Sequence, residues 1–299
     1  MSVPCPGAPK PTGGVIATIT RRDGDPRDAG LIRLGTNQPL GDYLRAVWTR
    51  REYMISVPVS DFRAENLDTV LGNVWHVLNP LLQVGVYFLV FAVILKTDRG
   101  LDNFLTFLAV GVFTYHFTQR SALKGAKAIV SNEGLIRSIG FPRVILPVAT
   151  VLGEGLAYLP AVVVMFIVAL ATGVSPSPFW GLLVVVMLLQ VILNFGLAFI
   201  AARITTMFRD FENMLPFMLR IVFYMSGILY AVDRKIDSAT LRRLFDFNPV
   251  YAIAALARDA VFGVPAPKIL WISAGVWAAV LFVGGFFFFK AGERSYGRI

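Results

Sequence analysis

The sequence has 299 residues, 56% of them hydrophobic, and its mean hydropathy is +0.65. Because the apolar residues gather in long runs, these values exclude an ordinary soluble protein. The net charge of +9 includes no basic run interleaved with aromatic residues, which argues against nucleic-acid binding. The single cysteine, Cys5, excludes an intramolecular disulfide and is interpreted as a free thiol.

The N-terminal part divides into a tail and an amphipathic segment. Residues 1–37 are rich in proline, glycine and mixed charge, which predicts a flexible cytosolic tail without a cleavable signal. Residues 38–75 are predicted to form an interfacial helix, at about Leu40–Ile55, and a connector. Trp48 with flanking arginines favours a place in the lipid headgroup layer, and packing on a soluble partner is the alternative. One helical face carries Leu40, Tyr43, Leu44, Val47 and Trp48.

Six apolar runs lie near the length of ~20 residues that a bilayer requires. They predict an all-α polytopic membrane protein with a six-span transmembrane domain at residues 76–299. Most of the 28 lysines and arginines fall on the side that holds the N-terminus, which predicts a cytoplasmic-membrane protein with both termini cytosolic. The predicted spans are about Val77–Leu95, Leu101–Thr118, Val144–Ala171, Phe179–Ala202, Pro216–Val232 and Ile269–Phe289.

A short amphipathic segment at about 125–140 connects the second and third spans. Glu133 and Arg137 are spaced as an i, i+4 ion pair, and Pro142 ends the helical pattern. The segment predicts a small cytosolic helix that contacts a soluble partner. Its apolar positions at helical spacing are Ile129, Ile136 and Ile139.

Several polar residues lie within or beside the predicted spans. Glu154, inside the third span, is expected to pair with an arginine, and lining a wet cavity or binding a coupling ion are the alternatives. Gln190 and Asn194 share one face of the fourth span, which favours hydrogen bonds between helices. His76 and His116, the only histidines, flank span ends and are interpreted as interface residues rather than a proton relay.

The outer connection at 233–268 contains a well-delimited helix. Asn248 suits an N-cap, Pro249 the first helical position and Gly263 the stop. The helix between them has ~14 residues and a length of ~21 Å, too short for the ~30 Å bilayer core. Because it also contains Arg258, it is expected to re-enter the membrane or to lie at the outer surface. A re-entrant hairpin that closes a pathway and a surface helix without a special role both stay open.

The order of these segments, over about residues 38–299, resembles the permease subunit of polysaccharide-exporting ABC transporters of the O-antigen and teichoic-acid type. The stretch Thr69-Val-Leu-Gly-Asn-Val-Trp75 is similar to the actinobacterial branch that exports lipid-linked galactan. One departure is that only Arg63 is basic where the family usually has a basic cluster before this stretch. The motifs that carry the resemblance are Leu71-Gly72, Trp75, Asn79-Pro80, Ile129-Val-Ser-Asn132, Phe141-Pro-Arg143, Ile145-Leu-Pro147, Arg209-Asp210, Asn248-Pro249 and Arg258.

The resemblance implies the type-2 ABC exporter permease fold, a homodimer, and two separate ATPase subunits that hold MgATP. The chain itself has no Gly-x-x-x-x-Gly-Lys-Ser/Thr loop, so it is expected to be a transport subunit rather than an enzyme, without a cofactor or metal of its own. The expected substrate is a polyprenyl-pyrophosphate-linked polysaccharide, specifically cell-wall galactan, in contact with membrane lipids. The residues expected to couple to the ATPase are Asn132, Glu133, Leu135 and Arg137.

In the resembling family the first and fifth spans line the pathway, and flat aromatic rings there could stack on the apolar faces of sugars. An ion-coupled secondary transporter that uses Glu154 is the alternative. A membrane enzyme is disfavoured, because the sequence lacks the paired carboxylates that such an enzyme would need. The expected pathway residues are Tyr87, Phe88, Phe91, Phe217, Phe223, Tyr224 and Tyr230. The expected contacts to the lipid pyrophosphate or to headgroups are Arg63, Arg203, Arg209 and Arg220, the last of which could instead snorkel to the headgroups.

Overall fold

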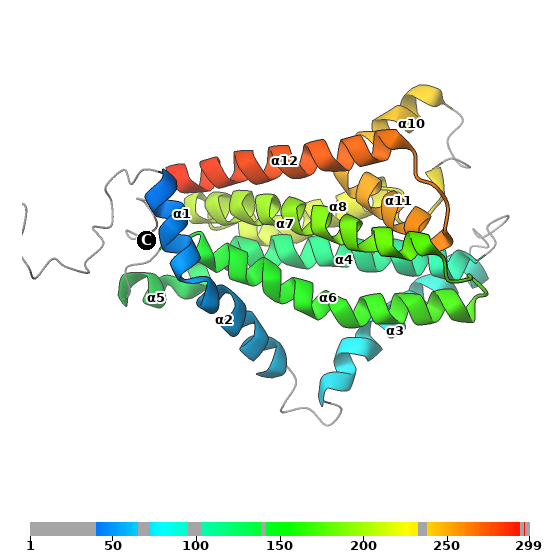
Figure 1. Ribbon diagram of the computed structural model, residues 1–299, viewed down its shortest axis with the longest axis horizontal. Coiled ribbons are helices and arrows are strands. Elements are labelled where there is room, and N and C mark those ends of the chain that lie inside the picture. The colour runs from blue at the N-terminus through cyan, green and yellow to red at the C-terminus, as the bar shows by residue number, and fades with distance from the viewer. Residues whose placement is uncertain are drawn as a thin grey trace, which may run out of the picture. The chain divides into compact units, whose positions relative to one another are not determined.

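In the computed structural model, all regular elements of the described residues are helical, as the composition predicts (Figure 1). The structure describes residues 40–64, 72–94, 103–138, 142–232, 238–293 and 296. The predicted tail at 1–37 lies outside these residues. The description below concerns the unit formed by Leu34–Ile299.

The predicted interfacial helix is two helices, α1 (Leu40–Thr49) and α2 (Arg51–Ala64). They meet at Arg50, whose backbone N–H donates to the carbonyl of Val47 in a single tight turn. The helix α2 packs against α6 (Ile145–Ala171). On α1, Leu44 and Trp48 are exposed, which leaves an apolar edge available to a membrane surface. Of the other apolar members of that predicted face, Leu40 is also exposed, Val47 is half-buried and Tyr43 is buried.

The six predicted spans overlap six helical segments. Three of the described helices are long and apolar enough to cross a membrane: Ile145–Ala171, Pro178–Met207 and Lys268–Ala291. A fourth apolar helix, Val77–Phe91, is shorter. The segments are α3 (Trp75–Phe88, preceded by a 3-10 turn at Gly72–Val74 and continued by a π-helical turn at Leu89–Ile94), α4 (Phe104–Lys127), α6, α7 (Leu182–Met207, preceded by a 3-10 turn at Pro178–Gly181), α8 (Phe211–Met225) and α12 (Lys268–Ala291).

Two helices end at residues that differ from the predicted span ends. The second span was expected to end at Thr118, but α4 continues to Lys127, so the predicted segment at 125–140 begins inside this helix. The fifth span was expected to reach Val232, but α8 ends at Met225. The chain turns there because Gly227 adopts a left-handed conformation, with φ of +58°.

The core of this unit surrounds α4, which is buried on nearly all sides and packs against α6, α7 and α11. The helix α12 packs along α7, and Figure 1 shows the two running side by side. Because protein rather than lipid surrounds α4, this helix tolerates the serine, threonine and glutamine side chains that lower its hydropathy.

The outer helix α11 (Pro249–Phe262) begins and ends where the sequence predicts. The Asn248 side chain accepts hydrogen bonds from the backbone N–H groups of Val250 (3.0 Å) and Tyr251 (3.4 Å), and Gly263 is left-handed at φ of +71°. The prediction of a plain surface helix is wrong, because most of α11 is buried against α4, α7 and α12. In Figure 1, α11 and α10 (Ala239–Asp246) lie at the end of the bundle opposite α1, α2 and α5.

Candidate functional site

The predicted coupling segment forms a 3-10 turn at Val130–Asn132 followed by α5 (Glu133–Ser138). Ile129 and Ile136 are buried, as their spacing predicts, and Ile139 lies outside the described residues. The segment therefore rests its apolar side on the protein's own helix ends. The cluster that receives them contains Tyr43, Ala128, Val144, Ile145, Leu146, Phe199, Ala202, Phe289 and Tyr296.

The polar residues of this segment have specific partners. The Asn132 side-chain amide donates to the carbonyl of Ala128 at 2.9 Å. Glu133 Oε1 lies 3.0 Å from Nη2 of Arg209, which is on the turn between α7 and α8. Leu135 is half-buried against the same apolar cluster, so it contributes only part of its side chain to an outer surface. The side chain of Arg137 lies outside the described part, so the predicted Glu133–Arg137 pair stays a prediction.

A half-buried carboxylate just after the end of α12 connects three parts of the chain. The Tyr43 hydroxyl donates to Glu293 Oε1 at 3.1 Å, and the backbone N–H of Arg143 donates to the same oxygen at 2.9 Å. The Arg143 guanidinium also donates to the Glu293 backbone carbonyl. Burial raises the pKa of the Glu293 carboxyl, while the hydrogen bonds from Arg143 and Tyr43 oppose that rise. Sequence reasoning missed this junction, because no local spacing relates its members.

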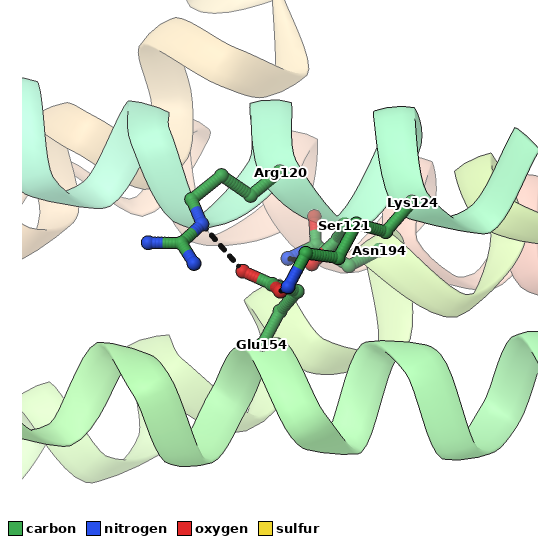
Figure 2. Close-up of polar contacts among 5 residues, drawn as sticks. All are labelled: Arg120, Ser121, Lys124, Glu154 and Asn194. Carbon is green, nitrogen blue, oxygen red and sulfur yellow. Dashed lines mark hydrogen bonds and ion pairs between the residues drawn. The ribbon is translucent and has the colours of Figure 1, made fainter. Parts of the chain in front are cut away.

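Glu154 lies at the centre of an ion-pair cluster between α6 and α4 (Figure 2). Its side chain is only 3% exposed, and Oε2 lies 2.7 Å from Nε of Arg120. Oε1 forms a second ion pair with Lys124, one turn further along α4. This geometry matches the expectation that Glu154 pairs with an arginine.

The hydrogen bonds between helices that the fourth span predicts are confirmed. The Gln190 amide donates to the carbonyl of Thr114 at 2.6 Å and to the Thr118 hydroxyl at 3.0 Å. The Asn194 amide donates to the Ser121 hydroxyl at 3.3 Å. Polar contacts therefore hold α7 against α4 along the same stretch that carries Glu154's cations.

Glu154 lines two cavities, which agrees with the alternative expectation that this residue lines a cavity. One has a volume of about 540 Å³ and lies between α2, α6, the end of α4 and the coupling segment. The other, of about 160 Å³, lies between α3, α4 and α6. Glu154 and Ala157 line both cavities, and Arg120, the ion-pair partner of Glu154, lines the smaller one. Polar side chains of the larger cavity are Lys124, Lys127, Ser131, Asn132 and Thr150, and those of the smaller are Asn79, Gln83, His116 and Arg120.

The structure does not gather the seven predicted pathway aromatics into one lining within a single chain. Phe223 is buried, with its ring centroid 5.7 Å from that of Tyr87 and 4.9 Å from that of Tyr115. Phe217 and Tyr224 are 69% and 55% exposed on α8, so these two remain available to a pathway or a partner. The four that are half-buried are Tyr87, Phe88, Phe91 and Tyr230.

The predicted headgroup arginines also engage separate partners. Arg203 Nη1 donates to the carbonyl of Gly292 at 3.3 Å, and its guanidinium carbon lies 5.5 Å from the Tyr296 ring centroid. Arg209 pairs with Glu133, and Arg220 lies 5.6 Å from the ring of its helix neighbour Phe217. The side chain of Arg63 lies outside the described part of α2.

Replacing Glu154 with glutamine is expected to lower the free energy of unfolding by about 1–3 kcal/mol, because two cations lose their buried acceptor. Urea or thermal unfolding in detergent measures this change. The double variant Glu154→Gln with Lys124→Met should be less destabilised than the two single changes summed. Complete loss of transport in a stably folded Glu154→Gln protein would contradict a structural role and favour a coupling ion.

The helical bundle and its long apolar helices define a multi-pass helical membrane protein. Residues 66–262 match the model of the ABC-2 type transporter family, and the chain belongs to that family. Permeases of this family are transport components that pair with ATPase subunits and are not themselves the ATPase.

Three curated proteins illustrate the similarity. The O-antigen export system permease protein RfbA of Klebsiella pneumoniae is 27% identical over 210 residues, which cover 70% of this chain and 79% of that protein. The RfbA permease of Myxococcus xanthus is also 27% identical over 210 residues, covering 70% and 80%. The polysialic acid transport protein KpsM of Escherichia coli is 24% identical over 195 residues, covering 64% and 74%.

Proposed function

We propose that this chain is the membrane subunit of an ATP-driven exporter of a lipid-linked polysaccharide. The substrate is cell-wall galactan on a polyprenyl pyrophosphate, and the complex contains two copies of this chain and two ATPase subunits. The similarity to the O-antigen and polysialic acid proteins supports a polysaccharide substrate. The galactan assignment rests on the Thr69–Trp75 stretch.

The α4–α6 connection is the observation that carries the proposal. Its isoleucines anchor it on the ends of several helices, while Glu133 stays partly exposed beside it. A short element fixed in this way transmits force instead of yielding to it, because packed interiors deform little. We expect the ATPase to bind this surface from the cytosol, on the side of the membrane that holds both termini.

The exposed face of α8 supports both the homodimer and the pathway. Side chains along this face are large and apolar, with Arg220 among them. In a monomeric unit such a face is covered by lipid, and in a dimer it faces the second copy across a central pathway. The exposed rings of Phe217 and Tyr224 would there contact the moving glycan. The apolar residues of this face are Met214, Phe217, Met218, Ile221, Tyr224 and Met225.

Purification of the tagged chain from membranes, followed by an ATPase assay, tests the proposal. We expect an ATP-hydrolysing polypeptide to co-purify at equal stoichiometry, and lipid-linked glycan to change its hydrolysis rate. A chain that purifies alone from cells with intact ATPases would contradict the proposal. Transport of glycan driven by an ion gradient without ATP would favour the secondary-transporter alternative.

The double variant Glu133→Ala with Arg137→Ala is expected to insert normally and to uncouple ATP hydrolysis from export. A charge at a docking surface contributes up to about 1 kcal/mol, so the loss of both should reduce coupled export by up to roughly 30-fold. Export and hydrolysis rates measured in the same vesicles give the coupling ratio. The matched control, Asp42→Ala with Arg45→Ala, removes the same charges from exposed positions on α1 and should leave the ratio unchanged. An unchanged ratio in the test variant would contradict the coupling role.

A further inference from the structure

Two ion pairs of opposite polarity join the coupling region to the start of α8. Lys127, the last residue of α4, lies with Nζ 2.7 Å from Oε1 of Glu212 in the first turn of α8. Glu133, the first residue of α5, accepts from Arg209 on the turn that precedes α8. The cation is on the α4 side in one pair and on the α8 side in the other. A shift of α8 along α4 would bring like charges together, so the two pairs together define one register.

Apolar packing behind these pairs brings the same helices together. Leu215 of α8 is buried with Ala126 of α4 and Ala201 of α7 in one small cluster, against which Leu219 also packs. The Tyr115 hydroxyl on α4 donates to the backbone carbonyl of Leu219. The first part of α8, as far as Leu219, is thus attached to α4 by an apolar cluster and by a hydrogen bond.

The end of α4 is also closely fitted to α7. A Cβ atom on Gly125 would lie 2.6 Å from the Cβ of Ala198, so the two backbones are in close contact. The helix α4 therefore cannot slide past α7 without separating from it. The coupling segment thus has two connections to the start of α8, one through the end of α4 and one through the Glu133–Arg209 pair.

We propose that the Lys127–Glu212 and Glu133–Arg209 pairs form a clamp that makes the coupling segment and α8 move together. This inference rests on the proposed function, in which α8 faces the export pathway. Arg209, Glu212 and Lys127 are then positioning residues that carry ATPase-driven motion to the pathway helix. The inference gives Arg209, the first residue of the sequence motif Arg209-Asp210, a role that the coupling segment alone does not explain.

Distance measurements on the permease alone test the contacts without the ATPase. Spin labels at Gly134→Cys and Asn213→Cys, in a Cys5→Ser background, report the separation of α5 from α8. Both positions are exposed, and a side chain at 134 meets open space. Glu133→Arg or Arg209→Glu is expected to broaden and lengthen the distance distribution, and the combined swap should restore it. Lys127→Glu or Glu212→Lys alone should likewise broaden and lengthen the distance distribution, and the two changes together should restore it.

Export by the full complex then tests the function of the clamp. Each charge reversal is expected to reduce export per ATP about fivefold, the fold-change that corresponds to about 1 kcal/mol, and each swapped pair should recover most of it. Asp210→Asn, which changes a charge in the same turn, is the matched control and should alter neither readout.

The outcomes separate the clamp from the proposed function. Distances that respond to reversal and recover with the swap, together with export that follows them, support the clamp. Altered distances with unchanged export per ATP would overturn its role in transmission while leaving the exporter intact. Unaltered distances in every variant would overturn the clamp itself. A wild-type complex without ATP-dependent export would overturn the proposed function, and with it the transmission role.

Discussion

Replacing Arg258 with alanine is expected to abolish stable folding of the α8–α11 region. The guanidinium is 6% exposed and donates to three backbone carbonyls: Nε to Phe107 at 3.2 Å, Nη1 to Gly227 at 3.0 Å and Nη2 to Ile228 at 2.6 Å. Its carbon lies 3.5 Å from the Phe107 ring centroid, a close cation–π contact. One side chain on α11 therefore joins α4 to the turn after α8.

The free energy of unfolding is expected to fall by at least about 3 kcal/mol, because alanine leaves three buried carbonyls without the guanidinium donor and creates a cavity. Two of those carbonyls, of Gly227 and Ile228, follow the end of α8 at Met225, where no helix satisfies them. Lysine at position 258 should rescue only part of the loss, because one ammonium cannot reach three acceptors in the fork geometry of a guanidinium.

Thermal unfolding in detergent, together with limited proteolysis of the 226–248 region, measures the effect. The control Arg243→Ala removes an exposed arginine from α10 and should leave the melting temperature nearly unchanged. A melting temperature of Arg258→Ala within a degree or two of wild type would contradict the structural role.

The limits of α11 could be predicted from sequence because they depend on local chemistry. Asn248 caps its own helix, Pro249 is preset for the first turn, and Gly263 supplies the left-handed residue. The partners of Arg258 could not be predicted, because Phe107 lies far away along the chain and no spacing rule relates the two. The sequence favoured neither a surface helix nor a re-entrant one. The burial of α11 against three helices excludes the surface helix.

The coupling segment shows the same division between local features, which the sequence predicts, and long-range contacts, which it does not. The spacing of Ile129 and Ile136 predicts a buried face, and both side chains are buried. The same reasoning pairs Glu133 with its i+4 neighbour, which stays a prediction, and it does not reveal the ion pair of Glu133 with Arg209 from a different connection. Charge spacing within a helix reveals local pairs, and only the packing of α4, α7 and α8 brings these two loops together.

Replacing Gly196 with leucine is expected to separate α7 from α12 and to destabilise the protein by about 3 kcal/mol or more. Even a Cβ at 196 would lie 2.3 Å from the carbonyl carbon of Leu281 and 2.6 Å from the backbone nitrogen of Phe282. These are backbone atoms, so no side-chain rotation relieves the clash. Gly196→Ala should already lower the free energy of unfolding by about 1–3 kcal/mol, because α7 and α12 must move apart along their main contact.

The neighbouring glycines of α12 provide a matched test of this argument. A Cβ on Gly285 would lie 2.6 Å from the carbonyl oxygen of Gly196, whereas a Cβ on Gly284 meets no atom within 4 Å. Gly285→Ala is therefore expected to lower the melting temperature. Gly284→Ala should leave it unchanged or raise it, since alanine favours the helix by about 1 kcal/mol over glycine. Equal effects of the two alanines would mean that helix propensity, and not the close approach of α7 to α12, sets the requirement for glycine.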